Sequence, residues 1–256
     1  MMLKGGFTNY GEVIGVLMLD TRFPRPVGDI GNAESYPFPV RFKTVKGALP
    51  VRIMGDRPQP ELIEPFIEAA RELEAEGVRA ITTSCGFLAP FQRELTAAVG
   101  IPVFTSSLLQ VPLVSRLIGP SRKVGIFTER EQHMNDHHFN GAGWSAAEVN
   151  VHVQGMKADA VFPSVYIGNR TESAFDVLRA EMEAMTHAFL EECPDAGTIV
   201  LECTNMCPFS SFIARISGLP VFDINTLINL FCSTSTARPQ NHQRRYGKFA
   251  PQYVCC

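Results

Sequence analysis

The stretch Ile81-Thr82-Thr83-Ser84-Cys85-Gly86-Phe87-Leu88-Ala89-Pro90-Phe91 decides the fold, because it occurs twice in the chain. It begins as a buried strand, passes a cysteine in a short polar turn, and enters a helix with proline in its first turn. The same construction returns 118 positions later, as Ile199-Val200-Leu201-Glu202-Cys203-Thr204-Asn205-Met206-Cys207-Pro208-Phe209. The match continues without a gap, since Pro102-Val103-Phe104 is repeated as Pro220-Val221-Phe222. We therefore interpret the chain as two copies of one unit, each presenting one cysteine.

The two copies share one order of predicted elements. Besides the two cysteine strands, strands are expected at 12–19, 38–45, 101–105, 123–128 and 148–153, and helices at 61–76, 90–99, 108–118, 129–139 and 172–192. The order β, β, α, β, α, β, α favours a parallel sheet flanked by helices in each copy. The sequence thus predicts an α/β fold of two pseudo-symmetric lobes, with an active site in the cleft between them.

The predicted domain boundaries follow the repeat. The first lobe is expected at residues 1–120 and the second at 121–232. From residue 233 the pattern disappears, so residues 233–256 are expected to form a loosely ordered tail. Cys255 and Cys256 at its end are not expected to be catalytic. A proline- and glycine-rich loop at 23–39 is long enough to serve a function rather than only to connect strands.

The overall composition excludes several classes of protein. The 256 residues are 45% hydrophobic and 19% charged with a net charge of −3, which argues against nucleic-acid or membrane-surface binding. The apolar run near the start is too short to cross a bilayer and lacks a cleavage site, so no signal peptide is expected. Seven cysteines without a disulfide framework indicate a reducing cytoplasm. Whether the chain forms a homo-oligomer is left open.

Four strand ends are the candidate site positions. In parallel α/β sheets, ligands bind beyond the carboxyl ends of the strands. Cys85 and Cys203 lie at such ends, as do Thr128 and the pair Asp20 and Thr21, where two further apolar strands end. Two facing lobes would place the thiols on opposite sides of a bound molecule. For Asp20, a role in capping the loop is an equal alternative.

Each cysteine also directly precedes a predicted helix. The amino terminus of a helix carries unpaired N–H groups and about half a positive charge, which favour a thiolate. The same N–H groups and the small polar side chains beside them form a cradle for a substrate carboxylate. The candidate substrate-binding residues are Asp20, Thr21, Thr83, Ser84, Gly86, Phe87, Thr128, Thr204 and Asn205.

Competing interpretations are weaker. A single cysteine after a buried strand is usually a core residue, but two at equivalent positions favour a function. Cys203 and Cys207 lack a second pair with metal-ligand spacing. His133, His137 and His138 are expected to form a solvated or lobe-facing cluster. No metal or cofactor is therefore expected.

The repeated cysteine motifs resemble those of the aspartate/glutamate racemase superfamily, over roughly residues 12–232. This group includes aspartate, glutamate and hydantoin racemases, arylmalonate decarboxylase and maleate isomerase. The resemblance implies a reaction without cofactor, in which one cysteine removes the α-proton of a carboxylate and the opposite cysteine returns one to the other face. Preorganised N–H donors would stabilise the carbanion.

The motifs depart from those of the amino-acid racemases at three places. Gly86 and Phe87 follow Cys85, where those racemases usually have Asn-Thr. Glu202 replaces a glycine, and Asn205 replaces an ionisable residue. Glu202 is expected to point to the opposite side of its strand from Cys203 and not to touch the substrate.

The leading hypothesis is a cofactor-independent racemase or epimerase of a small amino-acid-like carboxylate, with Cys85 and Cys203 as the acid/base pair. One alternative keeps the scaffold and uses one cysteine as the nucleophile of a maleate-type cis–trans isomerase. The other is a small-molecule binding protein whose cysteines are only packed. The substrate stays open between an amino acid, a hydantoin and a dicarboxylate.

Overall fold

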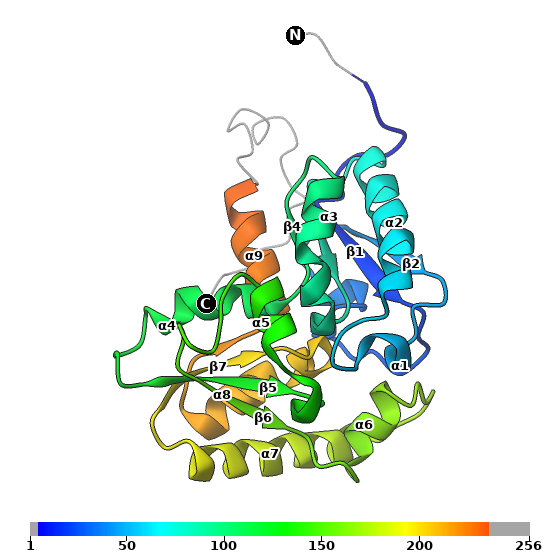
Figure 1. Ribbon diagram of the computed structural model, residues 1–256. Helices are drawn as coiled ribbons and strands as arrows, with labels where there is room; N and C mark the ends of the chain where they lie inside the picture. Colours follow the sequence, from blue (N-terminus) through cyan, green and yellow to red (C-terminus); the bar gives the residue numbers. More distant parts are fainter. Residues whose placement is uncertain (1–4, 236–256) are drawn as a thin grey trace, which may run out of the picture.

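Two four-stranded parallel sheets form the framework of the protein, which we describe for residues 5–235 of a computed structural model (Figure 1). The sheets have the equivalent orders β2-β1-β3-β4 and β6-β5-β7-β8. The strands are β1 (Ile14–Leu19), β2 (Val40–Val45), β3 (Ala80–Thr83), β4 (Val103–Phe104), β5 (Lys123–Thr128), β6 (Val151–Gly155), β7 (Ala196–Leu201) and β8 (Val221–Phe222). The predicted α/β fold with two related parallel sheets is confirmed.

The helices cover both sheets. The α-helices are α1 (Pro50–Ile53), α2 (Ile63–Ala75), α3 (Gln92–Ala98), α4 (Val111–Ser115), α5 (Asp136–Gly141), α6 (Val161–Tyr166), α7 (Phe175–Glu192), α8 (Ser210–Ser217) and α9 (Ile224–Ser235). The 3-10 helices are η1 (Ala33–Ser35), η2 (Pro60–Leu62), η3 (Gly86–Phe91), η4 (Ser107–Gln110), η5 (Glu131–His133) and η6 (Thr204–Phe209). Between residues 5 and 235, no helix combines the length and the hydrophobicity needed to span a bilayer.

The same packing device joins a helix to the inner strand of each sheet. In β1, a Cβ at Gly15 would lie 2.9 Å from the Leu73 side chain of α2. In β5, a Cβ at Gly125 would lie 2.4 Å from the Phe189 ring of α7. Because β1 and β5 pair on both sides, glycine there lets a large side chain from the helix fill the core.

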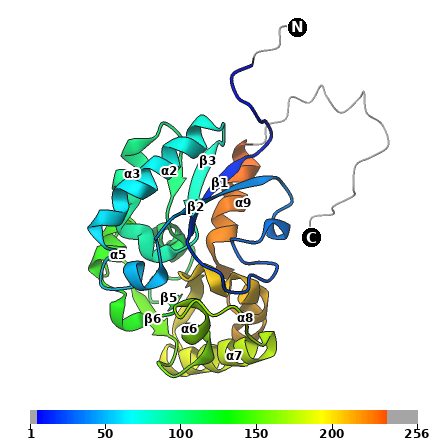
Figure 2. The same cartoon turned by 90° about the vertical axis from the view of Figure 1, so that its right-hand side faces the viewer.

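The last helix of each half packs against the sheet of the other half. Helix α4, which follows the first sheet, contacts β5 and β7. Helix α9 lies beside the first sheet (Figure 2), where Ile224 and Ile228 join Val16 in one buried cluster. The boundaries at 120 and 232 stay predictions, but residues 233–235 belong to α9 and not to a tail. The rest of the predicted tail, with Cys255 and Cys256, lies outside the described residues.

The single helix predicted at 129–139 is wrong. The chain bends at Glu129 directly after β5, makes the short turn η5, and starts α5 only at Asp136. Asn135 sets this start, because its side chain accepts the N–H of His137 and so caps the helix. Glu129 is thereby placed at the end of a strand, where the two sheets meet.

Candidate active site

One small cavity lies where the carboxyl ends of the two sheets face each other. Its volume is about 20 Å³, which is room for one water molecule. Its lining residues come from both halves: Leu19, Phe23, Pro50, Met54, Ser84, Cys85, Gly86, Glu129, Tyr166, Glu202, Cys203, Thr204 and Asn205. The two cysteines of the repeat therefore share one closed site, and a substrate larger than water requires the site to open.

The strand register defines which residues are equivalent. Leu17 of β1 pairs with Thr83, and Phe127 of β5 pairs with Leu201. One residue later, the N–H of Ser84 donates to Leu17 at 2.9 Å, and that of Glu202 donates to Phe127 at 2.8 Å. Ser84 and Glu202 are thus counterparts. Two residues beyond Leu17 and Phe127, the counterparts are Leu19 and Glu129, which both line the cavity.

The closed site favours the protonated form of both thiols. Burial raises the pKa of Cys85 above its ordinary value, and the Glu202 carboxyl adds to this, while the Phe87 N–H opposes it. Burial and the Glu129 carboxyl likewise raise the pKa of Cys203, against the Asn205 N–H. The N–H groups expected from the sequence are present. Burial outweighs their effect on the pKa of both thiols, so this closed site disfavours the expected thiolates.

A carboxyl group accompanies Cys203. Its Sγ donates to Glu129 Oε2 at 3.6 Å and contacts Asn205 Oδ1 at 3.9 Å. Glu129 is only 2% exposed, and burial raises the pKa of its carboxyl to about 8 against the Cys203 hydrogen bond. A carboxyl of this kind can take up and release a proton near neutral pH.

A second carboxyl group lies beside Cys85. Glu202 is 1% exposed, and its Oε2 accepts the Thr128 hydroxyl at 2.7 Å. Burial raises the pKa of Glu202 to about 8. Glu202 was expected to point to the opposite side of its strand from Cys203, and this is wrong, because both residues line one cavity. Strand β7 ends at Leu201, so strand alternation no longer decides the direction of Glu202.

Gly86 makes room for this carboxyl. A Cβ at position 86 would lie 2.3 Å from Glu202 Oε1 and 2.4 Å from the Glu202 carbonyl oxygen. Both separations are too short for any side chain. The two departures from the racemase motifs, glycine at 86 and glutamate at 202, are therefore parts of one arrangement.

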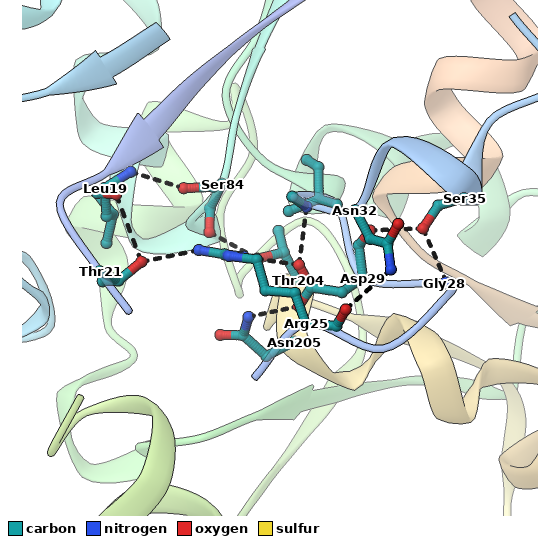
Figure 3. A network of polar contacts seen from close by, with 12 residues as sticks. Leu19, Thr21, Arg25, Gly28, Asp29, Asn32, Ser35, Ser84, Thr204 and Asn205 are labelled. Carbon is teal, nitrogen blue, oxygen red and sulfur yellow. Dashed lines mark hydrogen bonds and ion pairs between the residues drawn. The ribbon is translucent and has the colours of Figure 1, made fainter. Parts of the chain in front are cut away.

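A loop of the first half is hydrogen-bonded to the second half beside the cavity (Figure 3). Asn205 donates to Asp29 Oδ2 at 2.8 Å, and the buried Asp29 forms an ion pair with Arg25 at 2.6 Å. Across the same boundary, the Thr204 hydroxyl donates to the Ser84 carbonyl at 2.7 Å. The loop at 23–39 thus contacts the residues that follow Cys203, and its function stays a prediction.

Comparison with known proteins identifies the family. The profile of the Asp/Glu/Hydantoin racemase family matches residues 49–228. The chain belongs to this family. The resemblance inferred from the two cysteine motifs is confirmed.

Lyases are among the known proteins to which this racemase-family chain is similar. It is 30% identical to a dimethylsulfoniopropionate lyase of Durusdinium sp. clade D, over 82% of this chain and 70% of that protein. It is 29% identical to dimethylsulfoniopropionate lyase 7 of Emiliania huxleyi (strain CCMP1516), over 89% of this chain and 68% of that protein.

Among solved structures, the chain is similar to two racemases of the family. Allantoin racemase from Klebsiella pneumoniae has a TM-score of 0.57 and 13% identity, over 88% of this chain and 89% of that one. Glutamate racemase from Francisella tularensis has a TM-score of 0.52 and 16% identity, over 88% and 82%. At these identities the similarity shows the fold alone.

Several of the predicted binding residues of this family member do not line the closed cavity. The Thr83 hydroxyl donates to the carbonyls of Cys85 and Thr105 and fixes the turn. The Phe87 ring packs against His138, with centroids 4.6 Å apart. The Thr128 hydroxyl donates a hydrogen bond to Glu202 Oε2. As substrate contacts, these residues stay predictions.

Asp20 and Thr21 also lie outside the cavity lining. Asp20 Oδ2 accepts the N–H of Gly47 at 3.1 Å, which is the capping role given as its alternative. The Thr21 hydroxyl accepts from Arg25 at 2.8 Å. By register, Met18 and not Asp20 is the counterpart of Thr128.

The sequence interpretation missed other lining residues. Glu129 follows a predicted strand directly and could have been found by the same strand-end rule as Thr128. Tyr166 lies on the unpredicted helix α6, and its ring meets Phe23 edge to face at 4.9 Å. Its buried hydroxyl has no hydrogen-bond partner within the described part of the chain.

The remaining candidate clusters have structural contacts. His133 Nδ1 lies 3.0 Å from Asp56 Oδ1, and His138 is buried. Cys207 belongs to the apolar cluster around α9. Among residues 5–235, no group of three or more His, Cys, Asp or Glu side chains is arranged to hold a metal ion.

The two buried carboxyls predict how stability depends on pH. Their folded-state pKa values are raised from 4.5 to about 8, so the folded protein binds more protons than the unfolded chain between these values. Stability is fully present below about pH 4.5 and is lost as the pH rises through about 8. Each tenfold change in proton affinity is worth about 1.4 kcal/mol, so we expect a loss of several kcal/mol.

Thermal unfolding followed between pH 5 and pH 9 measures this loss. The double variant Glu129→Gln, Glu202→Gln serves as the control and is expected to unfold at a temperature that varies less with pH. A wild type whose unfolding temperature rises over this range, or matches the pH dependence of the control, would contradict the assignment.

Proposed function

We propose that this protein is a cofactor-independent lyase that removes the α-proton of a small carboxylate and expels a neutral group from the β-carbon. The observation that carries the proposal is the pair Cys85 and Cys203 in one cavity, each with a buried carboxyl beside it. The similarity to dimethylsulfoniopropionate lyases supports elimination, and makes dimethylsulfoniopropionate the first substrate to test.

The charges of the cavity favour this class of substrate. Two carboxyls, Glu129 and Glu202, line the cavity, and no arginine or lysine is among its lining residues. A second substrate carboxylate would be desolvated next to like groups, which argues against aspartate, glutamate and the maleate-type alternative. A cationic sulfonium fits better, because the carboxylate of Glu129 and the rings of Phe23 and Tyr166 attract it.

The reaction follows from the residues around Cys203. Ionised Glu129 accepts the Cys203 proton along the existing hydrogen bond, and a bound cation lowers the pKa of the thiol that burial has raised. The thiolate then takes the α-proton. The C–H electron pair forms the double bond, and the C–S bond breaks with its pair remaining on sulfur. Dimethylsulfoniopropionate thus gives acrylate, dimethyl sulfide and one proton.

A racemase or epimerase is the second candidate. It is favoured by the presence of two thiols in one cavity, since two acid/base groups on opposite faces permit inversion. Both reactions begin with removal of an α-proton, so they share a base and differ in what leaves. Membership in a family of racemases disfavours the binding-protein alternative.

Product analysis tests the proposal. Purified protein is incubated with dimethylsulfoniopropionate, dimethyl sulfide is measured in the headspace, and acrylate is measured by NMR. We expect both products in equal amounts, and none with the Cys85→Ala, Cys203→Ala double variant. In parallel, D- and L-amino acids and hydantoins are tested for α-proton exchange in deuterated water. Exchange without dimethyl sulfide release would replace the lyase by the racemase.

A further inference from the structure

Glu202 has a position that binding of a cation does not explain. Its carboxyl is fixed at one oxygen, because Oε2 accepts the Thr128 hydroxyl at 2.7 Å. The other oxygen, Oε1, is buried and has no hydrogen-bond partner among the described residues. The side chain lines the cavity beside Gly86, whose missing Cβ leaves Oε1 its space. One oxygen is therefore held, and the other is buried without a partner in the closed site.

The proton of this carboxyl belongs on Oε1. Oε2 already uses a lone pair to accept from Thr128, and an unpaired buried oxygen is best served by a proton that it can donate. Burial also favours the neutral form, since it raises the pKa of Glu202 to about 8. At neutral pH, Glu202 is then a hydrogen-bond donor in a water-poor site.

Glu129, the other buried carboxyl of the cavity, is the one that carries the negative charge. Glu129 accepts a hydrogen bond from the Cys203 thiol, and Arg130 lies close enough to favour its ionised form. Glu202 has only the Thr128 hydroxyl in that role. Two carboxyls in one buried cavity do not both ionise easily, so Glu129, which has the thiol donor and the nearby arginine, ionises and Glu202 keeps its proton.

The proposed reaction needs such a donor. Removing an α-proton moves negative charge onto the substrate carboxylate, which becomes a doubly charged enediolate. Among residues 5–235, no cationic side chain lines the cavity to stabilise it, and the N–H groups of Phe87 and Asn205 already face the two sulfurs. A neutral carboxylic acid can donate to the developing charge without repelling it.

We propose that Glu202 is a catalytic residue that acts as a neutral acid, donating a hydrogen bond from Oε1 to the substrate carboxylate as its α-proton is removed. This inference rests on the proposed function but holds for elimination and racemisation alike, because both pass through the same charge. Glu202 then stabilises that charge, and Gly86 makes room for the Glu202 carboxyl.

Two substitutions at position 202 distinguish a hydrogen-bond donor from a carboxylate and from a residue without a catalytic role. Glu202→Gln keeps a neutral N–H donor of the same length, so kcat/KM at pH 7 is expected to stay within about tenfold of the wild type. Glu202→Met fills the same volume without a donor, and we expect it to lose about 10²- to 10³-fold. If Glu202→Gln is as inactive as Glu202→Met, Glu202 works as a carboxylate. If both variants keep wild-type activity, it has no catalytic role. Either result overturns the proposal.

The pH profile separates catalysis from support of the fold. The other titratable groups that line the cavity are Cys85, Cys203, Glu129 and Tyr166. As Glu202 ionises near pH 8, kcat/KM of the wild type is expected to fall, while Glu202→Gln keeps its rate there. An alkaline fall that persists in Glu202→Gln would assign it to one of the other groups.

A readout without substrate keeps this inference separate from the proposed function. Carbon-13 NMR of the glutamate carboxyls, with the Glu202 signal assigned through Glu202→Gln, gives its pKa directly. A pKa near 8 supports the neutral acid even if dimethylsulfoniopropionate is not the substrate. A pKa near the ordinary 4.5 overturns it even if dimethyl sulfide is released.

Discussion

Cys203→Ala is expected to lower kcat/KM for the proposed elimination by about 10³-fold or more, because it removes the proposed base for the α-proton. The thiol is 5% exposed and hydrogen-bonded to Glu129, so its loss leaves no group in the same place to do this work. Steady-state release of dimethyl sulfide measures the effect. Circular dichroism of the variant confirms that the fold is intact, since removal of one buried sulfur costs only about 1 kcal/mol.

Cys85→Ala is the matched control, because this thiol occupies the equivalent position in the first half. Elimination needs one base, so Cys85→Ala is expected to lose less activity than Cys203→Ala, by about 10- to 10²-fold. Racemisation needs both thiols. Equal and complete loss in the two variants, with α-proton exchange abolished in both, would favour the racemase. Wild-type elimination in Cys203→Ala would defeat the assignment of the base.

Gly86→Ala is expected to lower the stability of the protein by about 3 kcal/mol and to abolish most of its activity. Its Cβ would stand 2.3 Å from Glu202 Oε1 and 2.4 Å from the Glu202 carbonyl oxygen. Both atoms belong to the other half of the molecule, so the two halves must separate or η3 must shift. Urea unfolding and the elimination assay measure the two effects.

Gly119→Ala is the control for Gly86→Ala. A Cβ at Gly119 would meet only the Arg122 side chain, at 3.9 Å, so it is expected to change stability by less than about 0.5 kcal/mol. Adding Glu202→Ala to Gly86→Ala should restore only part of the stability, because the carbonyl contact stays. A Gly86→Ala protein as stable and active as the wild type would contradict the close approach of the two halves.

The repeat made most of the fold predictable. An ungapped match between two cysteine strands implies two equivalent units, and buried apolar runs imply parallel strands. The sheet order and the cysteine positions in the structure agree with this. The exchange of α4 and α9 between the sheets was not predictable, because an amphipathic helix does not reveal which sheet it covers.

The site was only partly predictable, for reasons of local geometry. Glu202 was assigned the wrong direction because strand alternation was extended one residue beyond the end of β7. Glu129 was placed in a helix, although the cap at Asn135 delays that helix by several residues. Helix α6, which brings Tyr166 to the cavity, is short and contains Pro163, so its periodicity is too weak to detect.

The electrostatics of the site were the least predictable. The sequence shows helix starts that favour thiolates, but it does not show how deeply the sulfurs are buried. The structure places two further carboxyls beside them, and these together with burial raise the pKa of both thiols. Activation of Cys203 is therefore expected to depend on the charge of the bound substrate and not on the resting protein.

Covalent labelling tests most directly whether the two-cysteine cavity is the active site. The protein is treated with limiting iodoacetate, a carboxylate that alkylates thiolates, and the modified cysteine is located by peptide mass spectrometry while activity is followed. We predict that loss of dimethyl sulfide release parallels carboxymethylation of Cys203 or Cys85, one label per chain, and that dimethylsulfoniopropionate protects both. Full activity with either cysteine carboxymethylated, or inactivation with the label only on another residue, would contradict the account.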